Sequence, residues 1–132
     1  MTTPFVHRIR VRYGECDMQR VVFNANYMVY CDDAVDTWFR AALTPDGTGF
    51  ESIGFDFMLK TATLTWHAPL LFGETADLAC SVARWGNASF DVSISGTADG
   101  QQRFDATITY VSVTPGANRP ARIPELVRER LA

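Results

Sequence analysis

The sequence predicts an α+β fold in which a five-stranded antiparallel sheet wraps around one long central helix. Two observations carry this prediction: one stretch of helical period at residues 26–43, and four consecutive strand-like runs after it, joined by short turns. Strands joined by short turns pair antiparallel, and the apolar face of their sheet must be covered. The long helix is the one element available to cover it. With 132 residues, the chain is expected to form a single domain over 1–132.

A first strand is predicted at residues 5–13 (FVHRIRVRY), where apolar and basic side chains alternate. One face of this strand carries Ile9, Val11 and Tyr13, and the other carries Arg8, Arg10 and Arg12. We expect the arginine face to be solvated, and binding of an anion is the alternative.

The helix is predicted at residues 26–43 (NYMVYCDDAVDTWFRAAL), where apolar side chains recur at steps of three and four residues. Asn24 or Asn26 is the expected N-cap, because a short amide side chain can accept a hydrogen bond from the first free backbone amides. Asp36 and Arg40 lie one turn apart on the polar face and are expected to pair.

The remaining strands are predicted from alternating runs at residues 57–67, 74–84, 88–97 and 102–114. Asp99 and Gly100 separate the last two runs and are typical of a tight hairpin turn. The alternation of the last run changes phase between Tyr110 and Val111, which predicts a bulge there. A short helix is expected near the end, with Pro124 in its first turn.

Composition and charge exclude several classes of protein. The net charge is −3 and the sequence pI is about 5.2, which argues against non-specific binding to nucleic acid or to an anionic membrane. No apolar run approaches the length of a membrane-spanning helix, and no segment reads as a signal peptide. The three cysteines form no CxxC pair, so reduced thiols in a cytoplasmic protein are expected. Two distant histidines and scattered cysteines predict no metal site.

The stretch RYGECDMQRVVFNANYMVYCDDA, residues 12–34, resembles the acyl-CoA thioesterases of the hotdog fold, in the 4-hydroxybenzoyl-CoA thioesterase-like group. The pattern of that group runs R-Y-x-E-T/C-D, three residues, then V-V-Y/F-H/N-A-N-Y. Two later stretches, APLLFGETADLACSVARWGNASFDVSI and RPARIPELVRERL, are similar to further parts of the same group. The resemblance therefore covers nearly the whole chain.

This resemblance implies a catalytic role for Asp17, as nucleophile or as general base for water. It also implies that the first amides of the helix, around Asn24, Asn26 and Tyr27, hold the thioester carbonyl. The chemistry suits these groups, because a thiolate leaves without a strong acid and unpaired amides stabilise the oxyanion. The reaction would need no cofactor beyond the coenzyme A carried by the substrate.

Two further groups of residues are expected to contact the substrate. Arg20, Val22 and Phe23 belong to the motif that contains Asp17. Arg84, Trp85, Asn87 and Ser89 match the R-x-G-x-x-S turn of the family and are expected to hold the acyl carrier, with a solvated turn as the alternative. Arg103, Arg119 and Arg122 are candidates for the nucleotide phosphates, and the sequence does not choose among them. The resemblance also implies a homo-oligomer, either a dimer or a dimer of dimers.

The sequence departs from the group at two positions, with Arg20 where glycine is frequent and Asn24 where histidine is frequent. Asn24 can donate a hydrogen bond but cannot carry a proton, and Arg20 changes the requirement on the loop backbone.

Several alternatives stay open. Asp17 is a turn or cap residue in the simplest interpretation, Asp32 and Asp33 are rival carboxylates that also suit the helix dipole, and Glu15 is expected to form an ion pair or to face solvent. An acyl-carrier-protein thioesterase and a non-catalytic acyl-CoA-binding protein are the rival functions. A hydratase would use a histidine–acid pair, and the sequence contains only His7 and His67.

Overall fold

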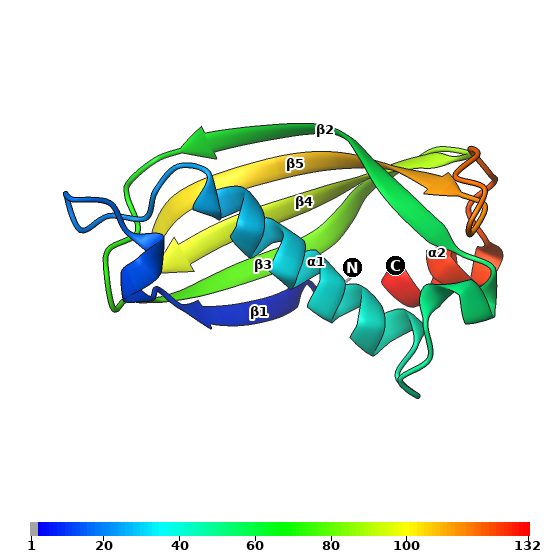
Figure 1. Ribbon diagram of the computed structural model, residues 1–132, viewed down its shortest axis with the longest axis horizontal. Coiled ribbons are helices and arrows are strands. Elements are labelled where there is room, and N and C mark those ends of the chain that lie inside the picture. Colours follow the sequence, from blue (N-terminus) through cyan, green and yellow to red (C-terminus); the bar gives the residue numbers. More distant parts are fainter. Residues whose placement is uncertain (1–2) are drawn as a thin grey trace.

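The fold is a single antiparallel sheet with one long helix lying across its face, as the computed structural model of residues 3–132 shows (Figure 1). The strands are β1 (Phe5–Arg10), β2 (Asp56–Trp66), β3 (Thr75–Trp85), β4 (Ser89–Ala98) and β5 (Gln101–Val113). They pair in the order β1-β3-β4-β5-β2, and every pair is antiparallel. The helices are α1 (Asn26–Leu43) and α2 (Glu125–Leu131), with short 3-10 turns η1 (Tyr13–Glu15) and η2 (Phe50–Ile53).

These observations confirm the predicted fold class and the predicted helix at residues 26–43. Each of the four later strands lies within one residue of its predicted bounds. The first strand is shorter than predicted, because it ends at Arg10 and the chain turns through η1. Tyr13, which was expected beside Ile9 and Val11, is therefore exposed, whereas Val11 is buried.

The core lies between α1 and the inner face of the sheet. The alternation that gives the sheet one buried face is clearest in strand β4, whose buried and half-buried residues alternate along its whole length. Phe39 of α1 packs against Phe57, Phe90 and Tyr110, with ring centroids 4.9 to 6.3 Å apart. The predicted pair of Asp36 and Arg40 forms on the opposite face of α1, with an N–O distance of 2.9 Å.

The start of α1 is fixed by Tyr27, which is fully buried against the sheet. Its ring meets the ring of Phe104 edge-on at 5.1 Å, and its hydroxyl accepts a hydrogen bond from the backbone N–H of Leu70 at 3.1 Å. Phe104 in turn lies over Gly96, where an added Cβ would stand 2.1 Å from the ring. Close packing on Gly96 therefore fixes the position of the Phe104 ring, against which Tyr27 at the start of α1 packs.

The predicted N-cap is wrong. Ala25 occupies the N-cap position of α1, and no side chain caps the helix there. The Asn26 side chain instead donates to the backbone oxygen of Glu15 at 2.9 Å, so it ties the helix to the preceding loop. Asn24 is exposed and its backbone oxygen accepts a hydrogen bond from the N–H of Tyr27.

The predicted bulge in the last strand is also misplaced. Residues of β5 continue to alternate through Tyr110 and Ser112, which are both buried. The extra residue of β5 is Arg103, which lies between the partners of Gly96 and Thr97 of β4, and β2 carries another where its register shifts between Leu59 and Thr61. Val111 faces the outer side of the sheet, and its apolar side chain wrongly suggested that the alternation of the last strand changes phase there.

The described residues contain no helix that is both long and apolar enough to cross a membrane.

Candidate active site

The segment between η1 and α1 folds back on itself as a small hairpin, residues 15–23. The N–H of Asp17 donates to the oxygen of Val21 at 2.9 Å, and the N–H of Phe23 donates to the oxygen of Glu15 at 3.0 Å. Cys16 and Val22 form the bridge between these two hydrogen bonds. This hairpin, called the Asp17 hairpin below, carries the predicted carboxylate at its tip.

The tip is a tight turn that uses the Asp17 side chain. The N–H of Gln19 donates to Asp17 Oδ1 at 2.8 Å, and the N–H of Arg20 donates to the backbone oxygen of Asp17 at 3.0 Å. Arg20 adopts a positive φ of 65°, in the left-handed region that glycine tolerates best. The turn therefore has a backbone conformation that favours glycine, although the residue at this position is arginine. Asp17 therefore has a structural role in its turn, and its second carboxylate oxygen makes no hydrogen bond within residues 3–132.

The loop between β2 and β3 supports the other side of the Asp17 hairpin. The N–H of Val22 donates to the oxygen of Leu70 at 2.9 Å, and the N–H of Phe72 donates to the oxygen of Arg20 at 3.1 Å. The loop is itself held by a buried ion pair, in which Arg103 contacts Glu74 at 2.6 Å. Val22, predicted to bind substrate, is buried in this arrangement, whereas Phe23 is exposed.

Arg103 was a candidate for binding nucleotide phosphates, and this assignment is wrong. Its guanidinium is buried and donates to both carboxylate oxygens of Glu74 and to the oxygen of Pro69. The hydrogen bonds from Arg103 hold the pKa of the Glu74 carboxyl below its usual range. Arg119 and Arg122, the other two candidates, are exposed near α2.

A cavity of about 680 Å³ opens at the tip of the Asp17 hairpin. Its lining includes Asp17, Cys16 and Arg20 together with apolar or small residues, namely Tyr13, Gly14, Met18 and Phe72. Tyr13 and Phe72 meet edge-on with ring centroids 6.0 Å apart. The sequence analysis missed Tyr13, Met18 and Phe72 as site residues. Tyr13 was instead predicted on the apolar face of the first strand, whereas Met18 and Phe72 are large apolar side chains in segments that carry turn residues, where no core position was predicted.

The amides at the start of α1 fall into two pairs. The N–H of Asn26 donates to the oxygen of Phe23 at 2.9 Å, and the N–H of Tyr27 donates to the oxygen of Asn24 at 3.4 Å. The N–H groups of Asn24 and Ala25 donate to no group among residues 3–132. Unpaired amides at a helix start attract negative charge. Of the predicted donors, Asn24 therefore remains available and Ala25 joins it, whereas Asn26 and Tyr27 are already engaged.

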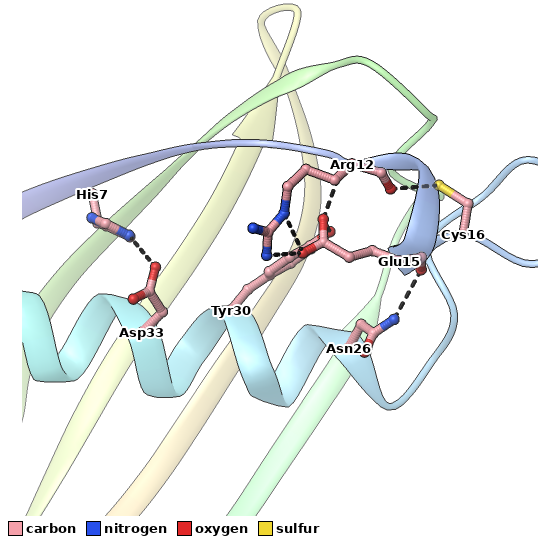
Figure 2. Close-up of polar contacts among 7 residues, drawn as sticks. All are labelled: His7, Arg12, Glu15, Cys16, Asn26, Tyr30 and Asp33. Carbon is pink, nitrogen blue, oxygen red and sulfur yellow. Dashed lines mark hydrogen bonds and ion pairs between the residues drawn. The ribbon is translucent and has the colours of Figure 1, made fainter.

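Glu15 connects η1 to α1 next to the Asp17 hairpin (Figure 2). Its Oε1 accepts hydrogen bonds from the backbone N–H of Arg12 and from the Tyr30 hydroxyl, both at 2.8 Å. Its Oε2 accepts hydrogen bonds from the Arg12 guanidinium at 2.7 and 3.0 Å. The expected ion pair of Glu15 is thus confirmed. Burial alone would raise the pKa of Glu15, but the hydrogen bonds from Arg12 and Tyr30 outweigh it and the pKa is lowered.

The second predicted group lies at the opposite end of the sheet, where β3 turns into β4 (Figure 1). Strand β3 has 11 residues, which corresponds to roughly 35 Å. Arg84 contacts Asp91 and Ser89, Trp85 packs under the Arg128 guanidinium, and the oxygen of Asn87 accepts a hydrogen bond from Ile123. One chain therefore does not bring this group to Asp17, and its role in substrate binding stays a prediction.

The remaining titratable residues are paired or isolated. His7 contacts Asp33 at 2.7 Å, and His67 contacts Asp105 at 2.6 Å. Burial raises the pKa of Asp32, a rival carboxylate that lies on α1. All three cysteines are free thiols. No set of three or more potential metal ligands converges anywhere in residues 3–132.

Comparison with known proteins agrees with this architecture. The profile of the thioesterase-like superfamily matches residues 11–131, which is most of the chain. The chain belongs to the thioesterase-like superfamily. The match includes η1, the Asp17 hairpin and every helix and strand except β1.

Solved structures of this superfamily share the hotdog fold of the chain. A gentisyl-coenzyme A thioesterase is 25% identical, with a TM-score of 0.83 over 97% of this chain and 100% of that one. A thioesterase superfamily protein of Jannaschia sp. CCS1 is 19% identical, with a TM-score of 0.89 over 97% of this chain and 90% of that one. The 1,4-dihydroxy-2-naphthoyl-CoA thioesterase of Synechocystis is 18% identical, with a TM-score of 0.82 over 96% and 94%. Thioester hydrolysis is the activity that the superfamily supports.

Proposed function

We propose that this protein hydrolyses an acyl-CoA to a free acid and coenzyme A, with Asp17 as the catalytic carboxylate. The observation that supports the proposal is the presence of three features on one short segment. The Asp17 side chain lines a cavity, the side chains beside it are largely apolar, and the unpaired amides of Asn24 and Ala25 follow within eight residues. A carboxylate and two free donors are the groups that thioester hydrolysis requires.

In the proposed reaction, the thioester carbonyl oxygen accepts hydrogen bonds from the N–H groups of Asn24 and Ala25. The Asp17 carboxylate attacks the acyl carbon, the carbon–sulfur bond breaks, and coenzyme A leaves as a thiolate. Water then cleaves the mixed anhydride, which returns Asp17 and releases the acid. Alternatively, Asp17 accepts a proton from a water molecule that attacks the acyl carbon directly. In both routes the amides stabilise the negative charge that develops on the oxygen.

The proposal of an acyl-CoA substrate rests on the family and on two similar structures, a gentisyl-coenzyme A thioesterase and a 1,4-dihydroxy-2-naphthoyl-CoA thioesterase. An acyl chain on a carrier protein presents the same thioester, so release from a carrier is the first alternative. The second alternative is an acyl-CoA-binding protein without catalysis. One observation favours it: Asp17 Oδ1 already accepts a hydrogen bond from Gln19, as in an ordinary turn.

A homo-oligomer is part of the proposal, and strand β2 supports it. This strand lies at an edge of the sheet, and 8 of its 11 residues are exposed, including Met58, Leu59 and Trp66. An exposed, partly apolar edge strand is a surface on which a second sheet can pair. A partner subunit would also supply an 84–89 turn to an Asp17 hairpin, because one chain keeps them at opposite ends. The free thiols support a cytoplasmic location.

The decisive experiment is a thiol-release assay across short, long and aromatic acyl-CoAs, with Asp17→Asn as the test variant. Asparagine keeps an oxygen that can accept the Gln19 N–H, so the turn is expected to remain intact. We expect hydrolysis to fall roughly 100- to 10,000-fold with an unchanged circular dichroism spectrum. Tight acyl-CoA binding without thiol release by the wild type would favour the binding protein. Faster turnover of a carrier-bound acyl chain than of the matched CoA ester would favour the carrier thioesterase.

A further inference from the structure

Glu15 is the residue through which three separate parts of the chain meet beside the Asp17 hairpin. It receives hydrogen bonds from Arg12, which follows β1, and from Tyr30, one turn inside α1. Its backbone oxygen also accepts the N–H of Phe23 and the side-chain amide of Asn26. Figure 2 shows this convergence, with Glu15 lying between Arg12 and Tyr30 above the start of α1.

The two kinds of contact have different consequences. The Arg12 guanidinium is largely exposed, with 76% of its side chain accessible, so solvent screens its ion pair and the pair is expected to add little to the stability of the fold. The Tyr30 contact is different, because Tyr30 is 4% exposed and its hydroxyl donates to Glu15. Both burial and the hydrogen bond to Glu15 raise the pKa of Tyr30, so the phenol stays protonated and remains a donor.

These links connect the segment that carries the proposed nucleophile to the segment that carries the proposed oxyanion donors. Asp17 follows Glu15 by two residues, and Asn24 and Ala25 lie between Phe23 and Asn26, which both bond to the Glu15 oxygen. The side chain of Glu15 therefore anchors one end of the Asp17 hairpin to α1, and its backbone oxygen anchors the segment that presents the free amides.

We propose that Glu15 is a positioning residue, which holds the Asp17 carboxylate at a fixed distance from the amides of Asn24 and Ala25 through its contacts with Tyr30 and Asn26. This inference rests on the proposed function. Glu15 does not contact the substrate in it, since the cavity at the hairpin tip is lined by its neighbours on both sides and not by Glu15. Small displacements of reacting groups are expensive: a shift of about 1 Å can lower a rate about 100-fold.

The test uses Tyr30→Phe, which removes one hydroxyl and keeps the buried ring, and Glu15→Gln, which keeps oxygen and nitrogen atoms in place of the carboxylate. Tyr110→Phe is the matched control, because Tyr110 is also buried against the sheet and its hydroxyl makes no hydrogen bond within residues 3–132. For each variant, kcat and KM for acyl-CoA hydrolysis are measured beside the amide exchange rate of Phe23.

We expect Tyr30→Phe and Glu15→Gln each to lower kcat by about 10- to 100-fold with KM changed less than about threefold. The amide of Phe23 should exchange faster in both, whereas Tyr110→Phe should resemble the wild type in all three measurements. The double variant should be no slower than the slower single variant, because Tyr30→Phe removes the hydrogen bond from the Tyr30 hydroxyl and Glu15→Gln weakens that same bond by removing the charge of its acceptor.

Three outcomes separate the possibilities. Unchanged kcat in Tyr30→Phe and Glu15→Gln, with Asp17→Asn inactive, would overturn the positioning role and leave the proposed function standing. A loss in Glu15→Gln as deep as in Asp17→Asn, with Tyr30→Phe unaffected, would also overturn it, because Glu15 would then act through its own charge. Full activity in Asp17→Asn would overturn the proposed function itself, whatever the other variants do.

Discussion

The two ends of the sheet carry the two groups of residues that the sequence marks as functional, and they differ in how their polar groups are satisfied. At the far end, Arg84 is paired with Asp91, and the oxygen of Asn87 accepts a backbone hydrogen bond. At the Asp17 end, one carboxylate oxygen and two backbone amides have no partner in the described chain. These groups belong to exposed residues, so water can satisfy them and a ligand can replace that water, whereas the far end offers fewer free polar groups.

A match to a family motif can therefore mark either a turn held by its own side chains or a segment with free polar groups. The 84–89 turn resembles a family pattern, yet within one chain its side chains stabilise the turn itself. The Asp17 hairpin is also held by its own hydrogen bonds, but these are mostly made by the backbone, which leaves side-chain and amide groups facing outward.

The largest effect on stability is expected from Arg103→Met, which tests the support of the Asp17 end. The substitution leaves the Glu74 carboxylate and the Pro69 oxygen without their donor in a largely buried site. We expect a loss of about 3–5 kcal/mol in the free energy of unfolding, measured with urea. The double variant with Glu74→Gln should recover part of this loss. A loss no larger than that of a surface ion pair would mean that the loop between β2 and β3 is held by other contacts.

Low pH should lower the stability that carboxylates contribute at both ends of the sheet. Hydrogen bonds from Arg103 lower the pKa of Glu74, and hydrogen bonds from Arg84 and Thr109 lower the pKa of Asp91. A lowered pKa in the folded state gives stability that is complete above the ordinary carboxyl range, about pH 4 to 4.5, and is lost as the pH falls through the lowered values. Urea unfolding from pH 7 to pH 3 should therefore show a decline at the acid end. Asp91→Asn and Arg103→Met should each flatten that decline, and an equally steep curve in both would contradict the assignment.

A smaller effect is expected from Arg84→Gln at the far end. The pair with Asp91 is partly exposed, so solvent screens it and its loss should change the free energy of unfolding only slightly. If a partner subunit brings this turn to the substrate, KM for an acyl-CoA should rise several-fold, whereas kcat should be retained. The same comparison with an acyl-pantetheine substrate, which lacks the nucleotide, shows whether the arginine contacts the phosphates. Unchanged KM for both substrates would mean that the 84–89 turn has a structural role and does not bind the substrate.

The smallest effect is expected from Arg20→Gly. Arginine at φ 65° is strained relative to glycine, but glycine gains more freedom in the unfolded chain, so the two contributions oppose each other. We expect a change of less than about 1 kcal/mol, or a few degrees in Tm. Arg20→Ala is the control, because it keeps the strain and removes the guanidinium. If Arg20→Gly lowered the free energy of unfolding more than Arg20→Ala does, the assignment of backbone strain at this position would be wrong.

The sequence predicted the fold well because period and turn chemistry agreed along the chain. The α1 helix has its apolar residues on one stripe, and the later strands alternate cleanly, as in β4. The errors arose where several groups compete for one partner. Asn26 was a plausible N-cap by residue type, but its amide bonds to the oxygen of Glu15, a contact that no local rule shows.

The sequence predicted the loop that carries Asp17 before the helix, and not which groups of that loop are free. The motif placed Asp17 before the helix, but which amides remain free depends on turn hydrogen bonds to Phe23 and Asn24. The cavity wall includes Phe72, which arrives from a loop about fifty residues away and is fixed by pairing with Arg20. Such contacts between distant segments leave no periodic signal in the sequence.

The hydrogen-bonded frame of the Asp17 hairpin separates two properties that enzymes must balance. The turn and the amides are held chiefly by main-chain atoms, whereas Tyr13, Met18 and Phe72 line the cavity with side chains that no hydrogen bond restrains. Exchange of those three side chains can therefore reshape the cavity while the hydrogen-bonded frame of the hairpin keeps its place. A scaffold of this kind can acquire new substrates by substitution at a few surface positions without rebuilding its chemistry.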